Sequence, residues 1–296
     1  MADASDAGAR LTGFRRWKAN CYRFLARSGV SRSFGLWLAV GFIFLLVIVA
    51  IFAPLISPYD PIAQNLRNTF APVSWAHPLG TDNAGRDVLS RVMWGTRPAL
   101  LGVLISLMTT TLVGIPWGLA AGYIGGAVDQ LLMRLADAFL VFPGIILALV
   151  LTSVLGPGLE TSMVALGLVY SPILARVVRS GVLSVRDREF VIVTYLYGLS
   201  AGYRMWRHVL PNALAPAIVQ LTLLAGMSLL AQTGLGFLGL GLKPPYPSWG
   251  SSLAESFRYI VVNPSASFAP GFTVALTVLA FYRIGDELRD RLALHH

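Results

Sequence analysis

Side chains that could support catalysis or bind a metal ion are few in this sequence, and they are scattered along it. The four histidines are His77, His208, His295 and His296, and the single cysteine is Cys21. A metal site or an activated nucleophile needs several such groups side by side. A proton relay needs ionisable residues inside a membrane segment, yet no histidine or acidic residue lies in the middle of an apolar segment. We therefore expect neither a metal site nor a catalytic centre.

Nucleotide-binding motifs do not change this expectation. The sequence has no Gly-x-x-x-x-Gly-Lys-Ser/Thr phosphate loop, and its only lysines are Lys18 and Lys243. Residues 234–239, GLGFLG, match a dinucleotide-binding pattern by letter, but they end an apolar segment and follow no strand. We interpret these glycines as the point where a helix unwinds. The chain itself is not expected to bind or hydrolyse ATP.

One polar pair lies inside an apolar segment. Ser228 and Gln232 are four residues apart, so a helix places them on one face. They could line a polar path for a substrate, or they could hydrogen-bond to a neighbouring helix, which is the commoner role of such residues in membranes. The sequence favours the second interpretation and leaves the first open.

The elements that carry these residues are membrane helices. The mean hydropathy is +0.67, and only 12% of residues are charged, against roughly a quarter in a soluble domain. The net charge of +9 does not indicate a nucleic-acid partner, because the arginines flank apolar segments and do not alternate with aromatic residues. We predict an all-α integral membrane protein in contact with the lipid bilayer. Its six transmembrane helices are predicted near residues 34–56, 99–123, 138–155, 159–178, 213–233 and 268–284.

The positive charges predict the orientation of these spans. With six spans, 17 of the 23 Lys and Arg residues fall on the side of the two termini, and such residues are concentrated on the cytoplasmic side of membrane proteins. We therefore expect both termini in the cytoplasm and the spans in the plasma membrane. The predicted order is a basic tail (1–33), a first span (34–56), an outer loop (57–98) and a five-helix core (99–292). Within the core we predict an inner loop over 184–212 and a second outer loop over 234–267.

Four glycines recur at every fourth residue of the uncharged run 98–128, which contains the second span; they are Gly114, Gly118, Gly122 and Gly126. This spacing places them on one helix face, where another helix can approach closely. The partner helix belongs either to the same chain or to another subunit. Packing within the chain is the favoured interpretation.

The inner loop over 184–212 has the features of a docking element. Ser184-Val-Arg-Asp187 matches a capping box and predicts that a helix starts there. Four consecutive β-branched residues, 191–194, favour a strand by propensity. An isolated strand would lack backbone partners, so we predict a short helix to about Tyr197 that Gly198 ends. Such a helix is apolar nearly all round and needs an apolar cleft in another protein.

Three stretches carry a resemblance to a known family. They are residues 77–91, HPLGTDNAGRDVLSR; residues 207–212, RHVLPN; and residues 237–250, FLGLGLKPPYPSWG. Together with GDELRD at 285–290 they cover the chain from about residue 30 to 292. The chain resembles the inner-membrane permease subunits of ATP-binding-cassette importers, in particular the second permease of dipeptide, oligopeptide and nickel systems.

The resemblance implies that the inner loop contains a coupling helix, which docks on an ATPase subunit. The family's Glu-Ala-Ala motif is absent, because Ile192, Val193 and Thr194 stand in its place; this departure implies apolar contact. The residues implied to couple the chain to the ATPase are Glu189, Val191, Ile192, Val193, Thr194, Gly198, Leu210 and Pro211. The implied partners are a sister permease, two ATP-binding subunits that hold ATP and Mg²⁺, and an extracytoplasmic substrate-binding protein.

The resemblance also implies a mechanism and an outer contact surface. Mechanistically, it implies alternating access: ATP binding in the partners opens the paired permeases outward. The residues expected to contact the binding protein are His77, Asp82, Arg86, Asp87, Pro245 and Trp249. The implied substrates are dipeptides and oligopeptides, with nickel or another small solute as the alternative. A secondary transporter or channel is disfavoured, because the sequence shows neither intramembrane charge nor an inverted repeat.

Overall fold

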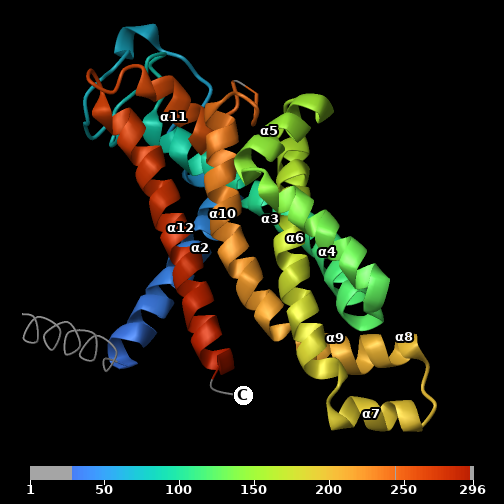
Figure 1. Ribbon diagram of the computed structural model, residues 1–296. Coiled ribbons are helices and arrows are strands. Elements are labelled where there is room, and N and C mark those ends of the chain that lie inside the picture. The colour runs from blue at the N-terminus through green and yellow to red at the C-terminus, as the bar shows by residue number, and fades with distance from the viewer. Residues whose placement is uncertain (1–28, 244, 294–296) are drawn as a thin grey trace, which may run out of the picture.

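The computed structural model describes residues 29–243 and 245–293 (Figure 1). Most of the predicted tail, up to residue 28, and the pair His295 and His296 lie outside these residues. Within them every regular element is a helix, apart from one isolated bridge between Thr81 and Asp87. The helices are α2 (Gly29–Ile56), η1 (Leu66–Asn68), α3 (Val88–Ile124), α4 (Gly126–Val141), α5 (Gly144–Leu155), α6 (Leu159–Arg186), α7 (Glu189–Leu196), α8 (Ala201–Arg204), η2 (Met205–Val209), α9 (Leu210–Ala213), α10 (Ala215–Phe237), α11 (Trp249–Phe257) and α12 (Pro264–Ala293).

Five of the described helices, α2, α3, α6, α10 and α12, are long and apolar enough to cross a membrane. A sixth span requires α4 and α5 to be counted together, and these two helices meet at an angle of 92°. The predicted span over 138–155 is therefore not one continuous helix: it starts inside α4, crosses the break and ends with α5. The break falls at Phe142 and Pro143. Proline disfavours the helical conformation in the residue before it, and Phe142 is extended, with φ −82° and ψ 138°.

Several helices are longer than predicted. α3 begins at Val88 and not near residue 99, because the Asp87 side chain caps it by accepting a hydrogen bond from the backbone N–H of Ser90 at 2.8 Å. α10 continues through Gly234 and Gly236 to Phe237. The expected unwinding occurs at Gly239, whose φ of +82° suits glycine. α12 begins at Pro264, so the helices take residues that were predicted to lie in the outer loops.

The α7 and α11 ends of the bundle lie far apart (Figure 1). The longest helices run between them, and α3 and α6 pack against each other more extensively than any other described pair. Their contact is close because glycines of α3 face α6. A Cβ added at Gly118 would lie 2.3 Å from the carbonyl oxygen of Ala175, and one added at Gly114 would lie 2.8 Å from that of Ser171. The favoured prediction of packing within the chain is confirmed for these glycines, whereas Gly126 lies outside α3 and begins α4.

The contact between α2 and α3 depends on an arginine and a proline. Pro54 has no N–H, so the carbonyl of Ala50 lacks its usual donor four residues later. The guanidinium of Arg97 supplies a substitute: its Nε donates to the Ala50 carbonyl, and its Nη2 donates to the Ile51 carbonyl at 2.9 Å. An unpaired carbonyl is costly in lipid. Arg97 therefore stabilises the end of α2 around Pro54.

This arrangement predicts a specific non-additivity. Arg97→Leu should lower the free energy of unfolding by about 1–3 kcal/mol, because the Ala50 carbonyl loses its donor. In a Pro54→Ala background the new N–H of residue 54 can reach that carbonyl, and the cost should be smaller by about 1 kcal/mol. Thermal unfolding in detergent of the wild type, the two single variants and the double variant measures both costs. Equal losses in the two backgrounds would show that Arg97 does not act through this carbonyl.

Candidate functional site: the two ends of the bundle

At the α7 end, the predicted capping box is wrong. α6 continues through the motif to Arg186, and Asp187 is its C-cap residue. Inside a continuing helix the backbone N–H groups are already paired, so the Ser184 hydroxyl donates to the carbonyl of Gly181 at 2.8 Å instead. The next helix, α7, begins at Glu189.

The prediction of a short helix ended by Gly198 is confirmed. α7 contains all four β-branched residues of the run 191–194 and ends at Leu196. Gly198 follows with φ +69°, the left-handed conformation typical of a helix C-terminus. Tertiary packing overrides strand propensity here, because Val191 is buried among core residues that include Val209 and Leu210.

The burial of Val191 divides α7 into two faces. Val191 is only 5% exposed, so it holds the helix to the body of the protein. Ile192 and Val193 are 48% and 45% exposed, and Leu196 and Tyr197 are still more exposed. The predicted helix is apolar on nearly all sides, but the side that carries Val191 packs inside this chain and is not available to another protein. The other face of α7 is apolar and exposed, and no other part of the described chain covers it.

Among the other residues implied to couple the chain, Glu189, Gly198 and Pro211 are exposed, Thr194 is half-buried and Leu210 is buried. Leu210 therefore packs inside and offers no surface. Figure 1 shows α7 standing clear of the long helices. An open hollow of about 360 Å³ lies beside it, lined by Tyr123, Arg186, Asp187, Val191, Ile192 and Arg204.

The chain returns from α7 to the bundle through a continuous helical rod formed by α8, η2 and α9. Its middle turn, η2, is a π-helix in which the N–H of Leu210 donates to the carbonyl of Met205. Pro211 accounts for the widening, because it has no N–H to donate to the carbonyl of Arg207 four residues earlier. The Asn212 amide donates to the His208 carbonyl at 2.7 Å. The sequence RHVLPN thus forms a wide but hydrogen-bonded turn that leads into α10.

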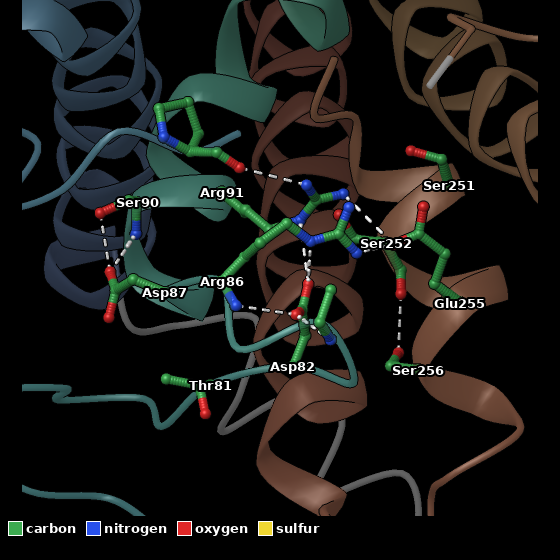
Figure 2. Close-up of polar contacts among 12 residues, drawn as sticks. Thr81, Asp82, Arg86, Asp87, Ser90, Arg91, Ser251, Ser252, Glu255 and Ser256 are labelled. Carbon is green, nitrogen blue, oxygen red and sulfur yellow. Dashed lines mark hydrogen bonds and ion pairs between the residues drawn. The ribbon is translucent and has the colours of Figure 1, made fainter. Parts of the chain in front are cut away.

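At the α11 end, two arginines and two carboxylates form a cluster, which we call the outer clasp: Asp82, Arg86, Arg91 and Glu255 (Figure 2). Arg86 Nε donates to Asp82 Oδ2 at 2.6 Å, and its Nη2 donates to Glu255 Oε2. Arg91 Nη2 lies 3.4 Å from the same Glu255 oxygen, and its Nε lies 3.6 Å from Asp82 Oδ2. Both guanidinium groups are buried.

Most residues predicted to contact a binding protein are inside the protein. Asp82, Arg86, Asp87 and Trp249 are each at most 6% exposed. Asp87 caps α3 and also contacts His77, whose Nδ1 lies 2.9 Å from Asp87 Oδ1. Only Pro245 among the predicted residues is fully at the surface, with His77 partly exposed. The buried residues shape this end of the molecule and do not present themselves to a partner.

Further hydrogen bonds hold the start of α11 and the segment that follows it. The indole N–H of Trp249 donates to the Val92 carbonyl at 2.9 Å, and its ring lies against Gly95 of α3. Beyond the end of α11, the Asn263 amide donates to the Thr81 carbonyl at 2.6 Å, and the Ser265 hydroxyl donates to the Leu79 carbonyl at 3.1 Å. Segments more than 150 residues apart in sequence are thereby joined.

The polar pair of α10 bonds to α3. The Ser228 and Ser106 hydroxyl oxygens are 3.0 Å apart, and both side chains are fully buried. The Gln232 amide donates to the Pro98 carbonyl at 2.7 Å and lies over Gly102. These contacts match the favoured interpretation, a hydrogen bond between helices. Gln232 also lines a small cavity beside Trp249, so its predicted contact with substrate stays a prediction.

Two residues of the outer clasp were not predicted as site residues. Arg91 lies within the motif HPLGTDNAGRDVLSR but was not separated from its neighbours by any sequence signal. Glu255 lies in none of the resembling stretches, and it meets Arg91 from 164 positions away. No three His, Cys, Asp or Glu side chains group to hold a metal ion within residues 29–243 and 245–293.

The described chain is thus a bundle of long apolar helices. The helix α7 projects from one end, and ion pairs and hydrogen bonds fasten α11 at the other. Residues 114–293 match the family of binding-protein-dependent transport system inner membrane components. Residues 34–72 match the N-terminal transmembrane domain of oligopeptide transport permease C. The chain belongs to this family of ABC importer permeases and is a multi-pass membrane protein.

Two relatives illustrate the range of the family. A dipeptide transport system permease protein of Alkalihalophilus pseudofirmus is 40% identical over 246 residues, covering 83% of this chain and 81% of the relative. A nickel transport system permease protein of Escherichia coli is also 40% identical, over 260 residues, covering 87% of this chain and 93% of the relative.

A solved structure supports the fold. A methionine ABC transporter in an inward-facing conformation contains a chain that aligns with a TM-score of 0.57 at 19% identity, covering 69% of this chain and 95% of that one. At this identity the likeness shows a common fold and nothing finer.

Proposed function

We propose that this chain is one permease half of an ATP-driven importer and that α7 is its coupling helix. The observation that carries the proposal is the exposed apolar face of α7, which lies outside the membrane-spanning helices. An apolar surface of this kind is typical of a protein interface. The partner is an ATP-binding subunit with an apolar groove. Both termini lie with α7 on the cytoplasmic side.

The assembly contains a sister permease, two ATP-binding subunits and an extracytoplasmic substrate-binding protein. ATP and Mg²⁺ belong to the ATP-binding subunits, and this chain contributes no catalytic group. The binding protein docks at the α11 end, where Pro245 and His77 reach the surface. The buried residues Asp82, Arg86, Asp87 and Trp249 hold the shape of that docking surface.

The geometry supports a lever at α7. Closure of the ATP-binding subunits moves α7 as a rigid body. Val191 belongs to the same buried cluster as Val209 and Leu210, and α7 contacts α6 and α8, so the movement reaches α6 directly and α10 through the helical rod α8–η2–α9. The long helices then open the pathway toward the binding protein, and ATP hydrolysis resets them. The substrate path lies between the two permeases.

The proposed substrates are dipeptides and oligopeptides, in keeping with the names of relatives at about 40% identity. The alternative substrate is nickel, since a nickel permease is equally identical. Uptake by the purified complex in vesicles, with labelled dipeptide and ⁶³Ni²⁺ in parallel, separates the two. We expect ATP-dependent uptake of dipeptide only. Uptake of nickel alone would establish the alternative, and uptake of either without ATP would identify a secondary transporter or channel.

A further inference from the structure

We infer that Glu255 is a positioning residue that joins the predicted outer loop and α11 into one rigid body. The inference rests on the proposed function for its role in transport, but not for its structural basis. Glu255 is the sole charged residue of α11. Its partners Arg86 and Arg91 come from the loop and from the first turn of α3 (Figure 2). It is therefore the one charge that α11 contributes to the outer clasp.

The charge balance of the outer clasp makes this contact hard to break. Asp82 and Arg86 stay together, because Asp82 Oδ1 also accepts hydrogen bonds from the backbone N–H groups of Ala84 and Arg86, each at 2.9 Å. Movement of α11 away from the loop would remove Glu255 and leave two buried guanidinium groups with one carboxylate. An uncompensated buried charge is strongly unfavourable. The loop must follow α11 wherever α11 moves.

The hydrogen bonds at either end of α11 also hold it to the loop and to α3. Trp249 holds the start of the helix to α3, and Asn263 and Ser265 hold the segment after it to residues 79–81. α11 also packs on both α10 and α12. A displacement of the loop by a docked partner therefore reaches two long helices through α11. Glu255 has the most exposed side chain of the outer clasp, at 29%, so it is the point where this contact can be weakened with least damage.

Substitution of Glu255 tests the inference directly. In the full chain in nanodiscs, Glu255→Gln should accelerate amide hydrogen exchange about tenfold in two segments together, residues 79–88 and 249–257. Glu160→Gln is the matched control, because Glu160 lies in the first turn of α6 at the same end of the bundle and is exposed. The control should exchange like the wild type. Faster exchange in α11 alone, or in neither segment, would overturn the inference.

A double variant separates charge balance from simple loss of a contact. Glu255→Gln with Arg91→Gln leaves Asp82 and Arg86 as a neutral pair, so exchange in both segments should be slower than in Glu255→Gln alone. Faster exchange in the double variant would contradict the role of charge balance.

In the assembled importer, Glu255→Gln should reduce stimulation of ATP hydrolysis by the loaded binding protein severalfold and leave basal hydrolysis unchanged. If Glu255→Gln speeds exchange in both segments but leaves the stimulation unchanged, the role in transport is overturned and the rigid body stands. If the wild-type importer shows no ATP-dependent uptake, only the proposed function is contradicted.

Discussion

Negative charge on the exposed apolar face of α7 should uncouple ATP hydrolysis from uptake. In the double variant Ile192→Asp and Val193→Asp, ATP-dependent uptake should fall at least about tenfold, because two carboxylates would have to enter an apolar groove without partners. Both side chains are about half exposed, so the free chain can solvate the new charges. The amount of protein inserted in the membrane should therefore match the wild type. Uptake and ATP hydrolysis in reconstituted vesicles measure the effect.

Two further variants make this prediction specific. The conservative change Ile192→Leu with Val193→Leu keeps the apolar face and should retain most uptake. Val191→Asp places a charge at a side chain that is only 5% exposed, so it should reduce the yield of folded chain. A poorly folding Val191 variant is thus no evidence on coupling. Wild-type uptake by the Ile192 and Val193 aspartate variant would show that α7 is not the docking surface.

The second large effect should come from Gly118. Gly118→Ala would bring a Cβ within 2.3 Å of the Ala175 carbonyl oxygen and 2.8 Å of the Val178 side chain. A backbone oxygen cannot turn aside, so α3 and α6 must separate. We expect a loss of about 1–3 kcal/mol in unfolding free energy, or more if the whole interface opens.

A matched glycine provides the control for that loss. Gly41 also lies inside a membrane helix, α2, but a Cβ there would meet nothing within 4 Å. Gly41→Ala should be neutral or slightly stabilising, because alanine favours the helix. Thermal unfolding in detergent compares the two variants. Equal stability of both would mean that α3 and α6 are not packed as closely as the structure shows.

The apolar composition of the chain was enough to predict its membrane helices, because hydropathy reports the solvent around a helix. It could not predict where each helix ends. Asp87 caps the start of α3 within a stretch rich in turn residues, so the residues around it predict a loop. The break at Phe142 and Pro143 was missed since an apolar run looks the same whether it is straight or bent by 92°.

The two candidate sites differ in how much of each could be predicted from the sequence. The existence of α7 followed from local reasoning about Gly198 and backbone pairing. Its two faces did not, because Val191 is buried in a core cluster whose other members come from other helices of the chain. At the other end, motif residues such as Arg86 and Trp249 were recognised, but their side chains point inward. Glu255 could not be predicted, because nothing in the sequence distinguishes a single glutamate in a short amphipathic segment from an ordinary surface residue.

The central claim is that α7 lies on the cytoplasmic side and contacts an ATP-binding subunit. Val193→Cys in a Cys21→Ser background provides the most direct test, because Val193 is exposed and Cys21 is the only native cysteine. In the assembled importer, a short bifunctional reagent that links this cysteine to a nearby lysine should join the chain to the ATP-binding subunit, with a yield that changes when ATP binds. In sealed right-side-out vesicles, a membrane-impermeant thiol reagent should leave it unlabelled. Labelling from outside, or an absence of any link to the ATP-binding subunit, would contradict the account.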